Sequence, residues 1–158
     1  MALGKTIDMI LPFHPGSARM PAVYRAMVES NGKPKLGATG RTLGVRKGID
    51  ITPSPVGMVG PGMGGMSVSP SLRTLPPHRI PRRLADKIPD ASGPNQNRIW
   101  CLGSGPWNGP MLTERLAIRP DPDKPDEHGF VEPAAEMGYD DYCAALEATQ
   151  DHWIIDEL

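Results

Sequence analysis

Residues 58–81 read MVGPGMGGMSVSPSLRTLPPHRIP, a stretch that limits what the rest of the chain can build. Up to Met66, Gly or Pro interrupts the sequence every two or three residues, so no regular element fits there. The next four residues, Met-Ser-Val-Ser at 66–69, have the length of a very short strand. Because side chains alternate along a strand, Ser67 and Ser69 should point to the same face. The stretch therefore predicts a loop-rich fold with a small polar surface near its centre.

The whole chain shares this character. Its 158 residues include 18 Gly and 19 Pro, nearly a quarter of the total, and only 5% are aromatic. The length is that of one domain, and the many short apolar runs, with 39% hydrophobic residues, favour a folded core. We expect a single domain over residues 1–158. Its predicted class is α+β, a small mostly antiparallel sheet with few short helices and long Gly/Pro-rich loops.

Short apolar or alternating runs predict the strands, which are expected at residues 6–11, 43–52, 66–69, 98–102, 116–119, 129–132 and 153–156, the second of them interrupted near Gly48. Residues 21–29 fit either a helix that begins at Pro21 or a strand rich in Val and Tyr. Residues 140–150 have the clearest helical spacing, and Asp140 is placed to cap them. Residues 82–88 can make about two helical turns before a proline stops them.

The charge of the chain restricts its partners. A net charge of -1 excludes a general attraction to nucleic acid or anionic membrane. Residues 73–87 are basic and residues 121–158 are acidic, which predicts opposed faces, although such runs are also typical of solvated surface. No apolar run approaches the roughly 18 residues of a membrane span, and no signal peptide is recognisable. Cys101 and Cys143 show no disulfide pattern, so we expect a cytoplasmic protein without membrane contact.

Several common sites are absent from the sequence pattern. The four histidines are scattered and neither cysteine has a partner at ligand spacing, so no metal site is predicted. Residues 60–65 are not followed by the Gly-Lys-Ser/Thr of a phosphate-binding loop. Residues 62–65 also lack the strand-to-helix setting of a dinucleotide fingerprint. A nucleotide site, if present, must be built differently.

Two parts of the central stretch can bind a ligand. In residues 64–70, two glycines let the backbone come close to a ligand, and the hydroxyls of Ser67 and Ser69 can bond to it. In residues 76–83, prolines stiffen the backbone around His78 and three arginines, a group suited to anionic phosphate. A tight turn with solvated serines and ordinary surface arginines is the alternative interpretation.

Two further candidates lie outside this stretch. Residues 128–133 read HGFVEP, and alternation sends Phe130 and Glu132 to one face of a strand. A carboxylate beside apolar surface is either paired with a cation or available as a catalytic base. Tyr24 and Arg25 form the other candidate, because the guanidinium can meet a phosphate.

Taken in order, Val23-Tyr-Arg25, the GGMSVS of residues 64–69 and the GFVE of residues 129–132 resemble the Arg, Ser and Glu strand motifs of ADP-ribosyltransferase toxins. The whole chain is also similar to small bacterial proteins related to a cytotoxic type VI secretion effector of that fold. This similarity runs through residues 43–46, 64–84, 129–133 and 142–153. The resemblance implies an ADP-ribosyltransferase-like fold and a toxin that uses NAD as its substrate without a metal.

Carried over residue by residue, the resemblance implies that Glu132 is the catalytic carboxylate. It also implies that Arg25 binds a phosphate or a ribose of NAD. The residues it implies for NAD binding are Tyr24, Arg46, Ser67, Ser69 and His78. Two positions depart from the family pattern: the Ser motif is not Ser-Thr-Ser, and Phe130 stands where many transferases have Gln or Glu.

The resemblance also implies a setting: a bacterial cytoplasm, delivery by a secretion system, an acceptor macromolecule, and a neutralising immunity protein or antitoxin. Two other functions remain open from the sequence. A metal-independent ribonuclease toxin can use His78 or His128 with Glu132 and the arginines. A non-enzymatic binding or assembly module can use the Pro-rich loops as contact surfaces.

Overall fold

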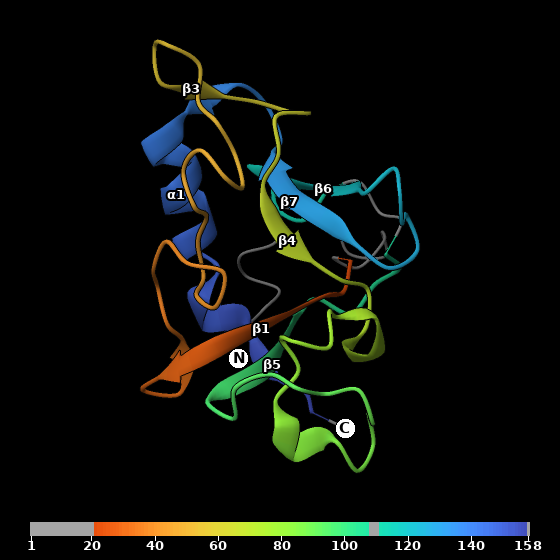
Figure 1. Ribbon diagram of the computed structural model, residues 1–158. Coiled ribbons are helices and arrows are strands. Elements are labelled where there is room, and N and C mark those ends of the chain that lie inside the picture. The colour runs from red at the N-terminus through yellow and green to blue at the C-terminus, as the bar shows by residue number, and fades with distance from the viewer. Residues whose placement is uncertain (1–20, 108–110, 158) are drawn as a thin grey trace.

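Antiparallel pairing dominates the computed structural model, which describes residues 21–107 and 111–157 (Figure 1). The first sheet has the order β2-β1-β5-β9 and consists of β2 (Lys33–Pro34), β1 (Val23–Ser30), β5 (Asn97–Leu102) and β9 (Ile154–Ile155). The second has the order β4-β7-β6 and consists of β4 (Met66–Val68), β7 (Gly129–Pro133) and β6 (Leu116–Pro120). A small pair joins β3 (Met58–Val59) to β8 (Met137–Gly138). With one α-helix, this is the α+β class that the sequence predicts.

The two larger sheets meet at a single bridge between Tyr24 at the start of β1 and Ser69 just after β4. The backbone N–H of each residue donates to the carbonyl of the other, at 2.8 and 3.0 Å. Beyond the bridge β1 and β4 diverge, as Figure 1 shows. Residues of both strands line a cavity beyond this point.

Strand β1 settles the ambiguity of residues 21–29 in favour of a strand. It is buried on both faces, which explains why its sequence lacks a simple polar and apolar alternation. Val23 and Met27 contribute to the main core, whereas Ala26 belongs to a second, smaller core. The strand therefore separates two apolar clusters, and Arg25 lies on the main-core face between Val23 and Met27.

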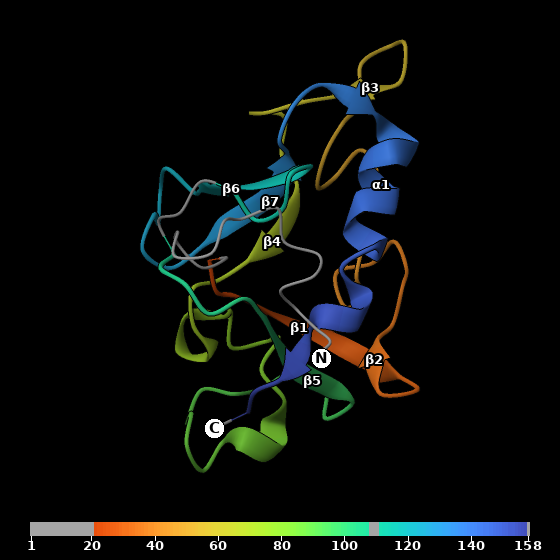
Figure 2. The ribbon, with the colours of Figure 1, turned by 180° about the vertical axis from the view of Figure 1, so that it is seen from behind.

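Within the described residues the single α-helix is α1 (Tyr139–Glu147), which stands beside the β4-β7-β6 sheet (Figure 2). It buries Tyr142 in the main core, where the phenol donates to the carbonyl of Val131 and accepts from the amide of Met66. The predicted Asp140 cap is wrong, because Gly138 is the capping residue. Asp140 lies in the first turn, where its negative charge interacts favourably with the positive end of the helix dipole. No helix in these residues is long and apolar enough to cross a membrane.

Five predicted strands are confirmed, with small shifts at their ends: they became β4, β5, β6, β7 and β9. The strand predicted at residues 43–52 is wrong, although its predicted interruption near Gly48 is confirmed. The Asp50 side chain accepts the amide of Arg46 at 2.7 Å, and Gly48 has φ +83°, so the chain turns. Apolar residues at 45 and 51 are nevertheless buried.

Three other expectations need comment. The helix predicted at residues 82–88 is reduced to one 3-10 turn, Arg82–Leu84. The carbonyl of Pro81 accepts from the amide of Leu84, three residues later, and Pro89 follows the segment. The stretch without regular structure contains the two-residue strand β3. The strand predicted at residues 6–11 lies outside the described residues.

The C-terminal segment is fastened by Glu157. Its carboxylate accepts bonds from Arg83 at 2.8 Å, from Arg98 at 3.0 Å and from the amide of Ile99 at 3.0 Å. Burial by itself raises the pKa of this carboxyl, but the bonds from Arg83 and Arg98 outweigh it and lower the pKa to about 2. The carboxylate therefore anchors β9 to β5.

We expect Glu157→Gln to lower the free energy of unfolding by about 1–2 kcal/mol at pH 7, an amount reduced by solvent screening. Because the folded pKa lies below the unfolded value, this contribution is full above about pH 5 and is lost as the pH falls toward 2. Urea unfolding of both proteins between pH 7 and 2.5 should show the two stabilities converging. A constant difference would contradict this assignment.

Candidate functional site

A cavity of about 150 Å³ lies where β1 and β4 diverge. Both strands line it, together with the loops around residues 40–50 and 75–79 and the residue just before β7. Its charged and polar lining consists of Arg25, Arg46, Asp50, Ser67, Ser69, His78, Arg79 and His128. Three guanidinium groups thus face one carboxylate.

Arg25 forms the inner wall and is only 6% exposed. Its guanidinium donates to the Thr42 carbonyl from Nε at 3.1 Å and from Nη2 at 2.9 Å, and to the Ser67 carbonyl from Nη1 at 2.8 Å. Burial lowers the pKa of Arg25 to about 10, so the group remains a cation at neutral pH. Among the described residues no carboxylate forms an ion pair with it, so its direct partners are carbonyl oxygens, and the negative charge of Asp50 acts on it only from a distance.

The other two arginines come from loops. Arg46 forms a two-point contact with Asp50, at 2.9 Å from Nη2 and 3.1 Å from Nε. Arg79 lies directly against Gly40, where an added Cβ would be 2.5 Å from its Nη2. Burial and the nearby charge of Arg46 lower the pKa of Arg79. Such a like-charged group in a concave site attracts anions, phosphates above all.

The two serines occupy the positions that alternation predicts. Ser67 and Ser69 both line the cavity, and Ser69 is almost fully buried. In the ladder between β4 and β7, Ser67 is opposite Phe130, so both side chains share one face. Ser67 lines the cavity, and Phe130 lies next to it on the same face of the second sheet, just outside the cavity.

Two imidazoles complete the wall. His78 is exposed at the rim, and its segment between prolines is held by ordinary turn bonds. His128 contacts Asp121 through Nδ1 at 2.9 Å and packs edge-on against Phe130, with ring centroids 4.9 Å apart. The hydrogen bond to His128 lowers the pKa of Asp121. Because a carboxylate only accepts, the neutral His128 ring carries its proton on Nδ1 and leaves Nε2 as an acceptor.

Glu132 lies further along the same face of β7 and does not line the cavity. Its side chain is 6% exposed, and Oε1 accepts bonds from Nε of Arg119 at 2.8 Å and from the amide of Gly62 at 2.9 Å. Two residues of strand separate it from Phe130, about 7 Å, and four separate it from His128, about 13 Å. Glu132 and the cavity are thus neighbouring parts of one surface.

The cavity therefore brings together Arg25, Arg46, Ser67, Ser69 and His78, five of the residues predicted from the sequence. Tyr24 lies elsewhere: its hydroxyl donates to Asp156 at 2.9 Å on the opposite face of β1, and burial raises its pKa. Sequence reasoning missed Asp50 and the Asp121 contact to His128. It also missed Arg119, because no pattern within one strand tells which residue of the next strand will face it.

In the described part of the chain, no group of His, Cys, Asp or Glu side chains is arranged to hold a metal ion. Comparison of the chain with protein-family profiles, with curated proteins and with solved structures found no match. The site must therefore be interpreted from its own geometry.

Gly40→Ala tests whether the cavity binds anions. The three atoms nearest to the added methyl would all belong to the flexible end of Arg79, which would be pushed out of place, so the fold should persist. We expect pyrophosphate affinity, measured by titration calorimetry, to fall about threefold or more, roughly 0.7 kcal/mol.

Gly60→Ala is the matched control, because its Cβ would meet only ordinary contacts at 3.6 Å near Glu136. Equal pyrophosphate affinity in all three proteins would show that Arg79 does not contribute to an anion site.

Proposed function

We propose that this protein is an ADP-ribosyltransferase-like toxin that binds NAD in the cavity between β1 and β4. One observation carries the proposal: three strands far apart in the sequence lie side by side. Arg25 on β1 donates to the Ser67 carbonyl of β4, and β4 pairs with β7, which carries Glu132. Arg25 and Ser67 are therefore in contact in the cavity, whereas Glu132 lies outside it, further along the strand that pairs with β4.

The electrostatics support a diphosphate ligand. Arg46 is neutralised by Asp50, but Arg25 and Arg79 have no ion-pair partner among the described residues. Two positive charges in one concave site match the two charges of a diphosphate. A bound diphosphate would also relieve the repulsion that lowers the pKa of Arg79.

The second sheet offers positions for the remainder of the NAD molecule. From the cavity toward Glu132 the order is Ser69, then Ser67 with Phe130, and then Glu132, of which Ser67 and Phe130 are half-buried and Ser69 and Glu132 are buried. NAD is long enough to place its diphosphate in the cavity and its nicotinamide ribose beside Glu132. Phe130 is half-buried and offers an aromatic surface to the nicotinamide ring.

In this arrangement Glu132 accepts a hydrogen bond from a ribose hydroxyl. Its negative charge stabilises the oxocarbenium-like ribose as the bond from C1′ to nicotinamide breaks. Nicotinamide leaves with the bonding electron pair, and the acceptor then forms a bond to C1′ and releases its proton. Action in a bacterial cytoplasm, delivery by a secretion system and a neutralising immunity protein belong to the same proposal and rest on the resemblance.

Glu132→Gln is the direct test. Glutamine keeps an acceptor for Gly62 but removes the charge, so NAD turnover should fall by about 100-fold or more while NAD affinity changes less than about threefold. Turnover is measured by nicotinamide release, and affinity by calorimetry. Bacteria expressing the variant should grow, whereas those expressing the unaltered protein should stop.

Glu136→Gln, an exposed carboxylate four residues later, is the control and should behave like the unaltered protein. The proposal fails if the unaltered protein neither binds nor consumes NAD, or if Glu132→Gln retains full turnover.

A second candidate, a metal-independent ribonuclease, is favoured by one observation: His78 and His128 line the same cationic cavity. His128, oriented by Asp121, is suited to accept the proton of a ribose 2′-hydroxyl, and His78 to protonate the leaving oxygen. The arginines would stabilise the charge on phosphorus.

If this candidate is correct, RNA is cleaved in the presence of a chelator and without NAD. His128→Gln should then lower the cleavage rate about 100-fold, and Glu132→Gln should leave it nearly unchanged, because Glu132 lies outside the cavity. Intact RNA under these conditions, followed by gel electrophoresis, would remove this candidate.

A further inference from the structure

The carboxylate of Glu132 is held in an asymmetric way. Oε1 accepts both protein bonds, from Nε of Arg119 and from the amide of Gly62. Oε2 accepts no hydrogen bond from any residue that the structure describes. An ionised carboxylate has about four acceptor positions, and a buried polar atom without a partner is uncommon in proteins. Oε2 is therefore a buried acceptor available to a donor that the chain itself does not supply.

The two donors differ in how they reach this oxygen. Gly62 belongs to the Gly-rich segment and has φ +85°; Gly64, two residues later, has φ +112° and an added Cβ there would be 2.3 Å from the Asp50 carbonyl. These glycines fix the course of the loop, and with it the direction of the Gly62 amide. One of the two donors is thus set by the backbone.

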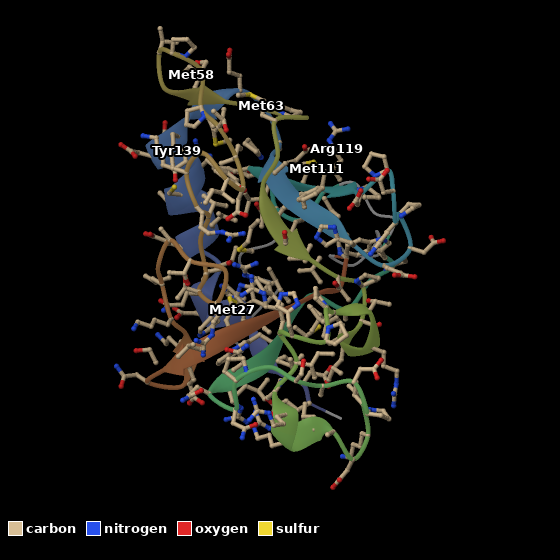
Figure 3. All side chains as sticks on the ribbon, in the orientation of Figure 1. Met27, Met58, Met63, Met111, Arg119 and Tyr139 are labelled. Atoms are coloured by element: carbon tan, nitrogen blue, oxygen red, sulfur yellow. The ribbon has the colours of Figure 1, made fainter. Side chains whose placement is uncertain are left out.

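Arg119 reaches Glu132 along the face of the sheet. In the ladder between β6 and β7, Arg119 is opposite Phe130, and the small Ala117 is opposite Glu132. The diagonal between Arg119 and Glu132 is about 7–8 Å, which a long side chain spans. Figure 3 shows Arg119 on the same side of the molecule as Met63 of the Gly-rich loop. The Arg119 side chain is 49% exposed, so the cation comes from the solvent side and meets a carboxylate that is 6% exposed.

We propose that Arg119 is a positioning residue, which holds Glu132 through Oε1 so that Oε2 faces a hydroxyl of the nicotinamide ribose. The identity of this ligand rests on the proposed function. The arrangement of the carboxylate does not, because both protein bonds are present without ligand. Arg119 acts through Glu132 and makes no contact with the reacting atoms.

The experiment compares Arg119→Gln, Arg119→Lys and the control Arg115→Gln. Arg115 immediately precedes β6 and is exposed, and its side chain forms no hydrogen bond or ion pair with any residue that the structure describes. Two measurements are made on each protein: NAD turnover, as kcat and KM, and hydrogen exchange of the Gly62 amide by NMR.

We expect Arg119→Gln to lower kcat about tenfold or more with KM changed less than about twofold, because ligand binding keeps its own contacts. Exchange of the Gly62 amide should accelerate about tenfold, since its acceptor is no longer held. Arg119→Lys should restore part of both effects, because it keeps the charge but not the planar donor geometry. Arg115→Gln should match the unaltered protein.

Two results would overturn the positioning role: unchanged Gly62 exchange in Arg119→Gln, or a raised KM with unchanged kcat, which would make Arg119 a direct ligand contact. If the unaltered protein neither binds nor consumes NAD, the proposed function fails. The Gly62 exchange rates then decide the role of Arg119 by themselves.

Discussion

The Arg25 guanidinium is the contact on which the rest of the structure depends. It lies on the first sheet, yet its hydrogen bonds go to the Thr42 carbonyl of a long loop and to the Ser67 carbonyl of the second sheet. A buried cation requires such partners, because its desolvation is otherwise unfavourable by several kcal/mol. The two sheets are consequently held at a fixed distance just beyond the point where they separate. The cavity exists because this side chain needs carbonyl oxygens from both of its walls.

The same requirement explains the charge of the cavity. Carbonyl dipoles orient the Arg25 cation without neutralising it, so a positive potential remains at the inner wall. Asp50 neutralises Arg46 and also fixes the turn that replaces a predicted strand. Arg79, packed on the bare backbone of Gly40, adds a further positive charge. A fold that needed only stability would gain nothing from gathering these cations, and this favours a role in binding an anion.

The sequence was sufficient for the elements whose pattern is local. Alternation predicted β7 and placed Ser67 with Ser69, and the run at residues 98–102 predicted β5. Within residues 43–52 it predicted the interruption near Gly48 but not the loss of the strand. There the Asp50 side chain accepts the amide of Arg46, four residues earlier, and ends the extended conformation that the apolar spacing favours. The pair of Arg119 and Glu132 was also beyond reach, because it depends on the register of β6 against β7. The contact between Arg25 and the Ser67 carbonyl was likewise beyond reach, since no local rule connects residues so distant in sequence.

The Gly-rich stretch has a larger part than its composition suggests. It continues into β4, whose serines line the cavity, and its Gly62 amide fixes the Glu132 carboxylate outside the cavity. One segment thus connects the cationic site with the carboxylate about 13 Å from its far wall. Under the proposed function, a dinucleotide would span both parts, with its diphosphate at the arginines of the cavity and its ribose at the Glu132 carboxylate.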